Sequence, residues 1–236
     1  MGWQVIDSGS LPPGQIMAKD EALLHQLDKQ SDPILHFYEW DRDCLTYGYF
    51  TDPTRYLDLD AIASHKIEMA RRPTGGGIIL HLTDFAFSVL VPASHPHFSL
   101  NTLENYAYVN QCIAKAVVLF TGNQVQPELL AEEENCTAAC LGFCMAKPTQ
   151  YDLIVQGKKV GGAAQRRTKQ GFLHQGSLSL AFPPASLLES ILKDKSQVLA
   201  AMQQHTYPLL GKEWTFSQLY LARQELKQLI QAALLA

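Results

Sequence analysis

The sequence predicts an α+β fold, in which a single domain holds a mixed, mostly antiparallel β-sheet flanked by α-helices. Short segments rich in aromatic and aliphatic residues are bounded by turn residues, as strands are. Longer stretches repeat apolar residues every three to four positions, as helices do. The 236 residues are 47% hydrophobic and 18% charged, with no internal repeat and no low-complexity linker. We therefore expect one domain over 1–236.

The first half of the chain is expected to supply a helix and two pairs of strands. Apolar residues over 16–27 follow helical spacing. The polar turn Asp41-Arg42-Asp43 separates two segments of strand character, and a third and fourth follow further along. The four strands are expected at 34–40, 44–50, 78–80 and 85–91.

The middle of the chain is expected to hold a long helix and then an irregular connection. Residues 103–121 have an apolar face at helical spacing, and Gly122 is placed to end that helix. Residues 124–143 are acidic and lack a period, which predicts a mobile connection.

The last third is expected to form a hairpin, one more strand and closing helices. Residues 151–165 indicate a hairpin that turns at Gln156-Gly157, with the next strand over 172–180. From about residue 185 two helices are expected. Their starts have the form of capping boxes, at Ser186–Glu189 and Thr215–Gln218.

Charge and composition exclude several classes of function. The formal net charge of −4 argues against a general nucleic-acid binder, which needs a basic surface. No apolar run approaches the ~20 residues of a membrane span, and the N-terminus lacks the pattern of a signal peptide. The five cysteines are an odd number in a chain of ordinary size, so a disulfide framework is not expected. A cytoplasmic protein without nucleic-acid or membrane partners is predicted.

A glycine-rich segment is the first candidate site. Arg71-Arg72-Pro73-Thr74-Gly75-Gly76-Gly77 is followed by His81. Three successive glycines are unfavourable in regular elements, but they allow backbone N–H groups to approach a ligand. The arginines suit a phosphate or a carboxylate. The alternative is a glycine-rich turn between strands, and the segment matches neither the P-loop nor the dinucleotide pattern.

A lysine segment is the second candidate site. Lys158 and Lys159 begin a strand that continues without bulky side chains, as Gly161-Gly162-Ala163-Ala164. An ammonium group can polarise a carbonyl or neutralise a phosphate. The alternative is a solvated surface pair, but the small residues indicate that something packs against the strand. Five basic residues over 158–169 form a patch suited to an acidic carrier protein.

Three cysteines are spaced by four residues, at Cys136, Cys140 and Cys144. This spacing places them on one helical face, yet it is not a standard zinc or iron–sulfur spacing. We expect no metal site, and small apolar packing is the usual role of such cysteines.

In order and spacing, these segments resemble the biotin/lipoate protein ligase and octanoyltransferase superfamily. The resemblance implies its catalytic-domain fold and acyl delivery to a lysine of a carrier protein. It places Lys159 on the active-site lysine and Trp40 beside the acyl tunnel. His174-Gln175-Gly176-Ser177 departs from the usual order by one position, which on a strand changes the face. The substrate-binding residues it implies are Trp40, Arg71, Arg72, Thr74, Gly75, Gly76, Gly77, His81, Gly161, Gly162, Ala163, Ala164 and Gly176.

Cys144 has a second interpretation through this resemblance. The segment from Cys144 through Pro148 to Tyr151-Asp152 is similar to one in a group of bacterial octanoyltransferases, whose cysteine carries the acyl chain as a thioester. The implied catalytic residues are Cys144 and Lys159. The thiolate attacks the thioester of an acyl-carrier protein, and a target lysine then takes the acyl group as an amide. This scheme needs no cofactor.

Two other functions stay open at this point. An ATP-dependent lipoate–protein ligase would form lipoyl-AMP with ATP and Mg²⁺ and would need no cysteine. A non-catalytic protein that holds lipoate or an acylated carrier is the weaker alternative. Biotin transfer is disfavoured because the arginine-rich loop of the biotin enzymes is absent. The implied partners are lipoyl-domain proteins, either a glycine-cleavage carrier or 2-oxoacid dehydrogenase subunits. The acyl group is octanoyl or lipoyl.

Overall fold

The computed structural model describes residues 2–132 and 142–236 and has the predicted α+β class. Within these residues, seven strands form a large sheet in the order β1-β2-β6-β10-β9-β8-β7, and three form a small sheet in the order β4-β3-β5. The strands are β1 Gln4–Leu11, β2 Ile34–Trp40, β3 Cys44–Tyr47, β4 Glu68–Arg71, β5 Ile79–His81, β6 Asp84–Pro92, β7 Glu128–Leu129, β8 Leu153–Val155, β9 Lys158–Arg167 and β10 Gly171–Ser179.

Strand direction in both sheets is mixed but mostly antiparallel, as predicted. The pairs β1–β2 and β3–β4 are parallel, and the other described pairs are antiparallel. The central pair is β6 with β10, and β10 continues antiparallel to β9. The lysine segment on β9 and the segment His174-Gln175-Gly176-Ser177 on β10 therefore lie on adjacent strands.

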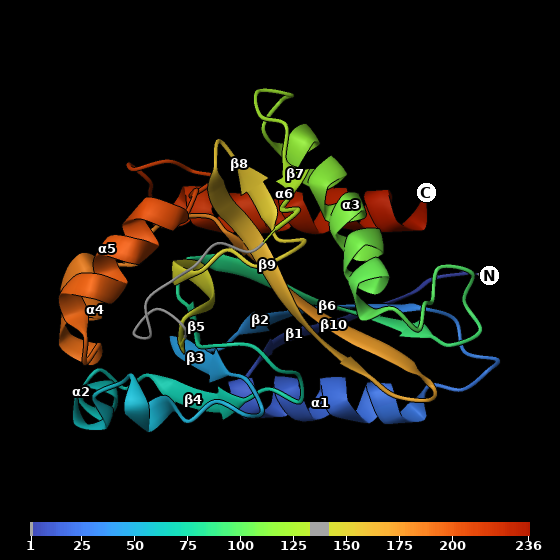
Figure 1. The fold of residues 1–236 in the computed structure, drawn as a ribbon, viewed down its shortest axis with the longest axis horizontal. Coiled ribbons are helices and arrows are strands. Elements are labelled where there is room, and N and C mark those ends of the chain that lie inside the picture. Colours follow the sequence, from blue (N-terminus) through green and yellow to red (C-terminus); the bar gives the residue numbers. More distant parts are fainter. Residues whose placement is uncertain (1, 133–141) are drawn as a thin grey trace.

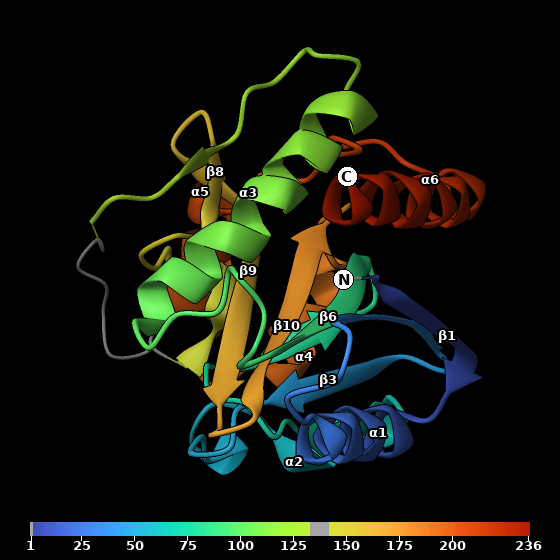
Figure 2. The ribbon, with the colours of Figure 1, turned by 90° about the vertical axis from the view of Figure 1, so that its right-hand side faces the viewer.

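Helices cover both faces of the large sheet (Figures 1 and 2). Helices α3 and α6 lie over one face, and α1 lies on the other side together with the small sheet. Helices α4 and α5 lie at one end, beside the short 3-10 helix η3. The helices are α1 Pro13–Gln26, α2 Leu59–Ser64, α3 Thr102–Phe120, α4 Ala185–Ile191, α5 Lys195–His205 and α6 Phe216–Leu235, with 3-10 helices η1 Pro53–Arg55 and η3 Cys144–Ala146.

The main core lies between the large sheet and the helix pair α3 and α6. Val109 and Ile113 of α3 and Leu226 of α6 are buried against Phe87 and Phe172 of the sheet. These helical residues belong to the apolar stripes seen in the sequence, so burial of one face holds each helix on the sheet. A second cluster packs the small sheet against α2, α4 and α5.

The hairpin between β8 and β9 forms as predicted. Gln156 and Gly157 both have positive φ, at 53° and 73°, which is the backbone of a type I′ turn. The tight turn fixes the register in which β9 starts. Lys158 and Lys159 therefore begin β9, and their side chains leave on opposite faces.

Other local expectations were wrong or incomplete. The strand expected over 44–50 ends at Tyr47, because Gly48 lies directly against the Gly75–Gly76 backbone. Three closing helices occur in the described residues instead of two. The capping box at Thr215 is confirmed. That at Ser186 is wrong, because α4 already begins at Ala185 after Pro184, which has no side chain able to cap.

Part of the middle segment lies beyond what the structure describes. The connection expected over 124–143 holds β7 in its described part. Residues 133–141, with Cys136 and Cys140, are outside the described residues, so the expected alignment of three cysteines is not addressed. Among the described helices, none combines the length and the apolar character that a bilayer crossing requires.

Candidate active site

The two motifs of the sequence meet through buried hydrogen bonds. The loop between β4 and β5 carries Thr74, whose hydroxyl donates to Oε1 of Gln175 on β10 at 2.7 Å. The Gln175 amide in turn donates to Asp20 of α1 at 2.6 Å. All three side chains are buried, and buried polar groups need such partners. The glycine-rich loop is thus attached to the strand that holds the second motif.

Asp20 anchors this connection from inside the protein. Its carboxylate also accepts from Ser88 at 2.6 Å and from Nδ1 of His36 at 2.7 Å. A fully buried carboxylate is costly unless it is hydrogen-bonded in this way. The sequence contained a signal for this role, since Asp20 is a charged residue on the apolar face of its helix.

Cys144 is held beside the same loop by backbone pairing. Ile78 forms a parallel bridge with Phe143, and the N–H of Cys144 donates to the carbonyl of Ile78 at 3.1 Å. This pairing starts η3 at Cys144 and brings the thiol next to the glycines. The cysteine is free and half-buried.

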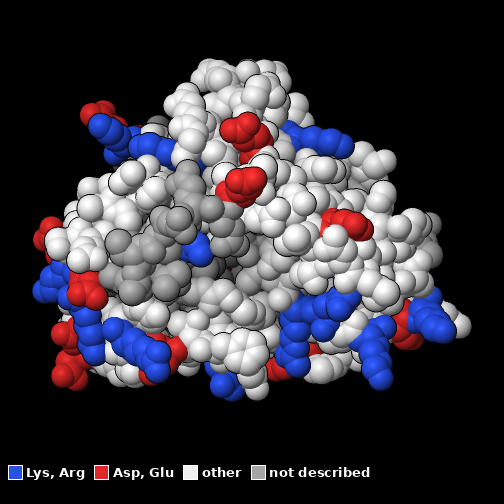
Figure 3. Space-filling view, in the orientation of Figure 1, with Lys and Arg blue, Asp and Glu red and all other residues white. Residues whose placement is uncertain are grey.

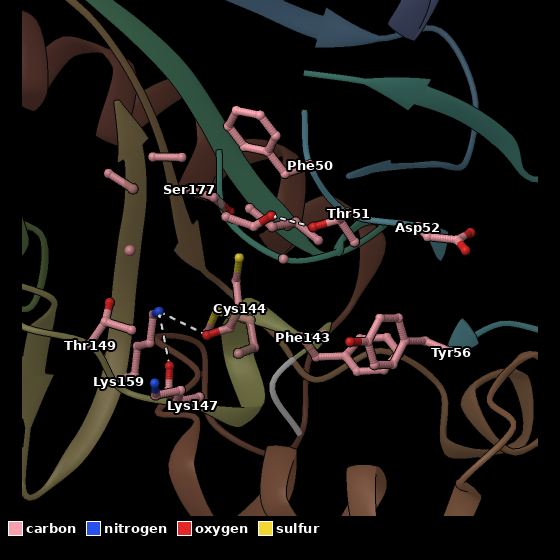
Figure 4. A pocket seen from close by; sticks show the side chains of 18 of the residues that line it. Phe50, Thr51, Asp52, Tyr56, Phe143, Cys144, Lys147, Thr149, Lys159 and Ser177 are labelled. Carbon is pink, nitrogen blue, oxygen red and sulfur yellow. Dashed lines mark hydrogen bonds between the residues drawn. The ribbon is translucent and has the colours of Figure 1, made fainter. Parts of the chain in front are cut away.

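The thiol faces a cavity of about 380 Å³ (Figure 4). This volume lies in the range of small-molecule pockets. Seven residues expected from the sequence line it: Gly76, Gly77, Cys144, Lys159, Gly162, Ala163 and Ala164. Other lining residues were not expected from the sequence, among them Thr51, Asp52, Arg55, Tyr56, Phe143, Met145, Lys147, Thr149 and Ser177.

Lys159 is buried, and its ammonium group forms an ion pair and hydrogen bonds. Its ammonium lies 2.7 Å from Asp152 Oδ2 and donates to the carbonyls of Cys144 at 2.8 Å and Lys147 at 3.5 Å. Asp152 is held in turn by the backbone N–H and hydroxyl of Thr149. Lys159 is thus not a solvated surface lysine. Asp152 was missed as its partner, although Tyr151-Asp152 belonged to the recognised segment.

Gly162 leaves the room that this ion pair needs. A Cβ at Gly162 would lie 2.6 Å from Nζ of Lys159 and 2.9 Å from a carboxylate oxygen of Asp152. We expect Gly162→Ala to destabilise the protein by about 1–3 kcal/mol, because the pair must shift. Urea unfolding followed by circular dichroism measures this. Gly14→Ala is the matched control, since its Cβ meets nothing within 4 Å; equal stability of both variants would contradict the expectation.

A second set of expected residues lies behind the loop, away from the main cavity. Trp40 stacks on His81, with ring centroids 4.2 Å apart. His81 contacts Asp84 through Nδ1 and Thr46 through Nε2, each at 2.7 Å. Burial alone would raise the pKa of Asp84, but the charge and hydrogen bond of His81, together with Ser177 and Arg223, lower it. Trp40, Arg72, His81 and Gly176 line a small cavity of about 10 Å³.

The remaining expected residues lie elsewhere. Arg71 is exposed, and its guanidinium lies 4.7 Å from the centre of the Tyr49 ring. Thr74 and Gly75 line a surface groove of about 280 Å³ with Tyr49 and Phe50. Gly161 is buried against Leu178 of β10. The structure therefore does not place the following four expected residues at the cavity beside Cys144: Arg71, Thr74, Gly75 and Gly161.

The basic patch expected over 158–169 is divided. Lys159 is buried, and Arg166 pairs with Glu21 at 2.7 Å. Arg167 and Lys169 are exposed. On the face shown in Figure 3, lysine and arginine side chains gather along the lower edge, below a central hollow.

His174 lies on the opposite face of β10 from Gln175, as the one-residue displacement implies. Its Nδ1 accepts from the Gln165 amide at 2.9 Å, its ring stacks on Phe87, and its Nε2 has no partner among the described residues. Complete burial lowers its pKa to about 3. The residue that reaches the loop from this motif is Gln175.

This burial predicts an acid sensitivity of folding. The unfolded chain binds a proton at His174 below about pH 6.5, and the folded protein does so only near pH 3, so stability falls as the pH drops through this window. Between pH 7.5 and 5.0, the difference in His174 protonation lowers the free energy of unfolding by about 2 kcal/mol. Urea unfolding at both pH values should show a smaller loss in His174→Gln. His25→Gln, at a mostly exposed side chain, should keep the wild-type loss; equal losses in both variants would contradict the assignment.

In the part of the chain that the structure describes, no group of three or more His, Cys, Asp or Glu side chains is arranged to hold a metal ion.

Comparison with known proteins agrees with this geometry. Residues 12–212 match the lipoyl protein ligase A/B catalytic domain family. Octanoyltransferase LipM of Bacillus subtilis is 31% identical over 206 residues, covering 86% of this chain and 74% of LipM. LipM of Bacillus cereus is 33% identical over 205 residues, covering 85% and 73%.

A solved structure shows the same fold. The putative lipoate protein ligase Ta0514 of T. acidophilum, with bound lipoic acid, aligns with a TM-score of 0.73 at 21% identity, over 99% of this chain and 86% of that one. The resemblance inferred from the two motifs is confirmed, together with its fold. The chain belongs to the lipoyl protein ligase A/B catalytic domain family and is an enzyme of protein lipoylation.

Proposed function

We propose that this protein is an octanoyltransferase that carries the acyl group on Cys144. The observation that carries the proposal is the position of the Cys144 thiol, which is free and faces a cavity between the glycine-rich loop and β9. The likeness to LipM supports the transferase over the ligase. A ligase that passes through an acyl adenylate has no need of a cysteine at this place.

The proposed reaction has two steps that balance without a cofactor. The Cys144 thiolate attacks the carbonyl carbon of the donor thioester; a new S–C bond forms and the carrier's thiolate leaves. The amine of a target lysine then attacks the acyl-cysteine. The C–N bond forms, the Cys144 thiolate leaves, and the amine loses a proton. Exchange between thioesters is nearly isoenergetic and amide formation is downhill, so neither ATP nor Mg²⁺ is required.

The partners follow from this chemistry. We propose an acyl-carrier protein as donor and a lipoyl domain as acceptor, on a glycine-cleavage carrier or a 2-oxoacid dehydrogenase subunit. The lysine and arginine side chains that gather at the lower right of the face in Figure 3, which would attract an acidic carrier, support this choice. A cytoplasmic location belongs to the same proposal.

The test is intact-protein mass spectrometry after mixing the protein with octanoyl-carrier protein in the absence of ATP. We expect a mass gain of one octanoyl group that is lost in Cys144→Ser. Cys112→Ser is the matched control, because Cys112 is another half-buried free cysteine on α3 and should leave the adduct unchanged. An adduct that persists in Cys144→Ser would refute the proposal. Modification of a lipoyl domain only with free lipoate and ATP would identify the ligase instead.

A further inference from the structure

Arg72 carries a buried charge that forms no ion pair with a carboxylate in the described part of the chain. Its guanidinium is 3% exposed and donates to Thr46 Oγ1 at 2.8 Å and to the carbonyls of Gly75 at 3.0 Å and Gly77 at 2.7 Å. Among the residues described, no carboxylate forms an ion pair with it, and its Nε has no partner. A buried cation in this state favours an anion nearby.

The neighbouring group able to become that anion is the Cys144 thiol. A Cβ built on Gly76 would lie 3.1 Å from Nη2 of Arg72 and 3.6 Å from the sulfur of Cys144, so the guanidinium and the sulfur flank the same glycine. Burial lowers the pKa of Arg72, and negative charge at the Cys144 sulfur would oppose that shift. Gly76, with φ of +86°, keeps the space between the two groups free of a side chain.

Lys159, the cation expected from the sequence, is directed elsewhere. Its ammonium is bound at the Cys144 carbonyl and compensated by Asp152. Figure 4 shows the sulfur pointing away from that carbonyl and from the ammonium. Lys159 thus holds the backbone of the cysteine turn, while the sulfur itself faces the loop of Arg72.

A row of buried side chains supports Arg72 from behind. Arg72 donates to the Thr46 hydroxyl. The Thr46 hydroxyl lies 2.7 Å from Nε2 of His81, and Nδ1 of His81 lies 2.7 Å from Oδ2 of Asp84. Ser177 donates to the same oxygen of Asp84 at 2.7 Å. These contacts connect the guanidinium of Arg72, through Thr46 and His81, to the buried carboxylate of Asp84.

We propose that Arg72 is the cation that stabilises the thiolate of Cys144, and that Thr46, His81 and Asp84 are positioning residues that hold the guanidinium against the sulfur. The inference rests on the proposed function, in which Cys144 is the nucleophile. The two cations then have different roles. Arg72 stabilises the negative charge on the sulfur, both when the thiolate attacks and when it leaves. Lys159 holds the backbone of the turn at Cys144.

Tyr106, a titratable group near the sulfur, does not take this place. Tyr106 of α3 lies near enough for its charge to interact with that of Cys144, but burial raises its pKa to about 12, so it supplies no charge at neutral pH. Asp52, Arg55 and Lys147 line the cavity beside the thiol.

The test measures the reactivity of Cys144 rather than turnover. Alkylation by iodoacetamide is followed between pH 6 and 9 by mass spectrometry of the Cys144 peptide, in the full-length protein. Arg72→Gln should slow alkylation at pH 7 by about tenfold and move its pH midpoint upward, since the thiolate loses its counter-charge. Thr46→Val should slow it in the same direction, whereas Thr46→Ser, which restores the hydroxyl, should react at the wild-type rate.

Each outcome decides the point. Wild-type alkylation rates in folded Arg72→Gln and Thr46→Val would overturn the inference, as would equal slowing in Thr46→Val and Thr46→Ser. If Arg72→Gln does not fold, the Thr46 pair decides alone. Failure of the wild-type protein to take octanoyl from its carrier would refute the proposed function and leave the alkylation result standing. An octanoyl adduct on the wild type, with alkylation unaffected by the variants, would refute only the role of Arg72.

Discussion

Lys159→Met is expected to lower the free energy of unfolding by about 3–5 kcal/mol, because it leaves the buried Asp152 carboxylate without its counter-charge. Asp152 is 3% exposed, and among the described residues its carboxylate then keeps only the hydrogen bonds from Thr149. The same change releases the carbonyl of Cys144, so the cysteine turn loses its support. Urea unfolding of the variant at neutral pH measures the effect.

The adjacent lysine is the matched control for this prediction. Lys158 begins the same strand but is half-buried and leaves on the other face, so Lys158→Met should stay within about 0.5 kcal/mol of wild type. Adding Asp152→Asn to Lys159→Met removes the unpaired charge and keeps an acceptor for Thr149, so most of the lost stability should return. Equal losses in the two lysine variants would show that the buried ion pair contributes nothing.

Cys144→Ala is expected to lower the rate of octanoyl transfer to a lipoyl domain by at least ~10³-fold, since the acyl-enzyme cannot form. Stability should change little, because the thiol is half-buried and lines a cavity. The measurement is the initial rate of lipoyl-domain octanoylation with octanoyl-carrier protein as donor. Thermal unfolding of the same sample checks that the variant is folded.

This prediction has a control variant and an outcome that would contradict it. Cys112→Ala should transfer octanoyl at the wild-type rate, since Cys112 lies on α3 and outside the cavity. A Cys144→Ala protein that retains more than about a tenth of the wild-type rate would exclude an obligatory acyl-cysteine.

Much of the fold was predictable because its local signals are strong. The strands β2 and β6, the helices α3 and α6 and the turn at Gln156-Gly157 all form where periodicity or turn chemistry placed them. The strand β1 and the short elements β4 and α2 were missed. Segments such as Glu68–Arg71 have too few residues to show a period, and they become strands only by pairing with β3.

Among the site residues, the sequence indicated candidate side chains but not which of them meet. The motifs around Arg72 and Lys159 identified the family and the residue types of the cavity, because glycines and buried cations leave a pattern along the chain. Their pairing depends on contacts between distant segments: Thr74 with Gln175, Lys159 with Asp152, and Arg72 with Thr46.

The sequence by itself thus determined the fold class, the family and the identity of the candidate nucleophile. Only the tertiary structure decided where each cation lies. Lys159 and Arg72 are similar as charges along the chain, but a charge acts on the groups within a few ångströms of it. The packing of β9 against η3 directs Lys159 to a carbonyl and a carboxylate, and the loop after β4 brings Arg72 to the glycine that faces the sulfur of Cys144.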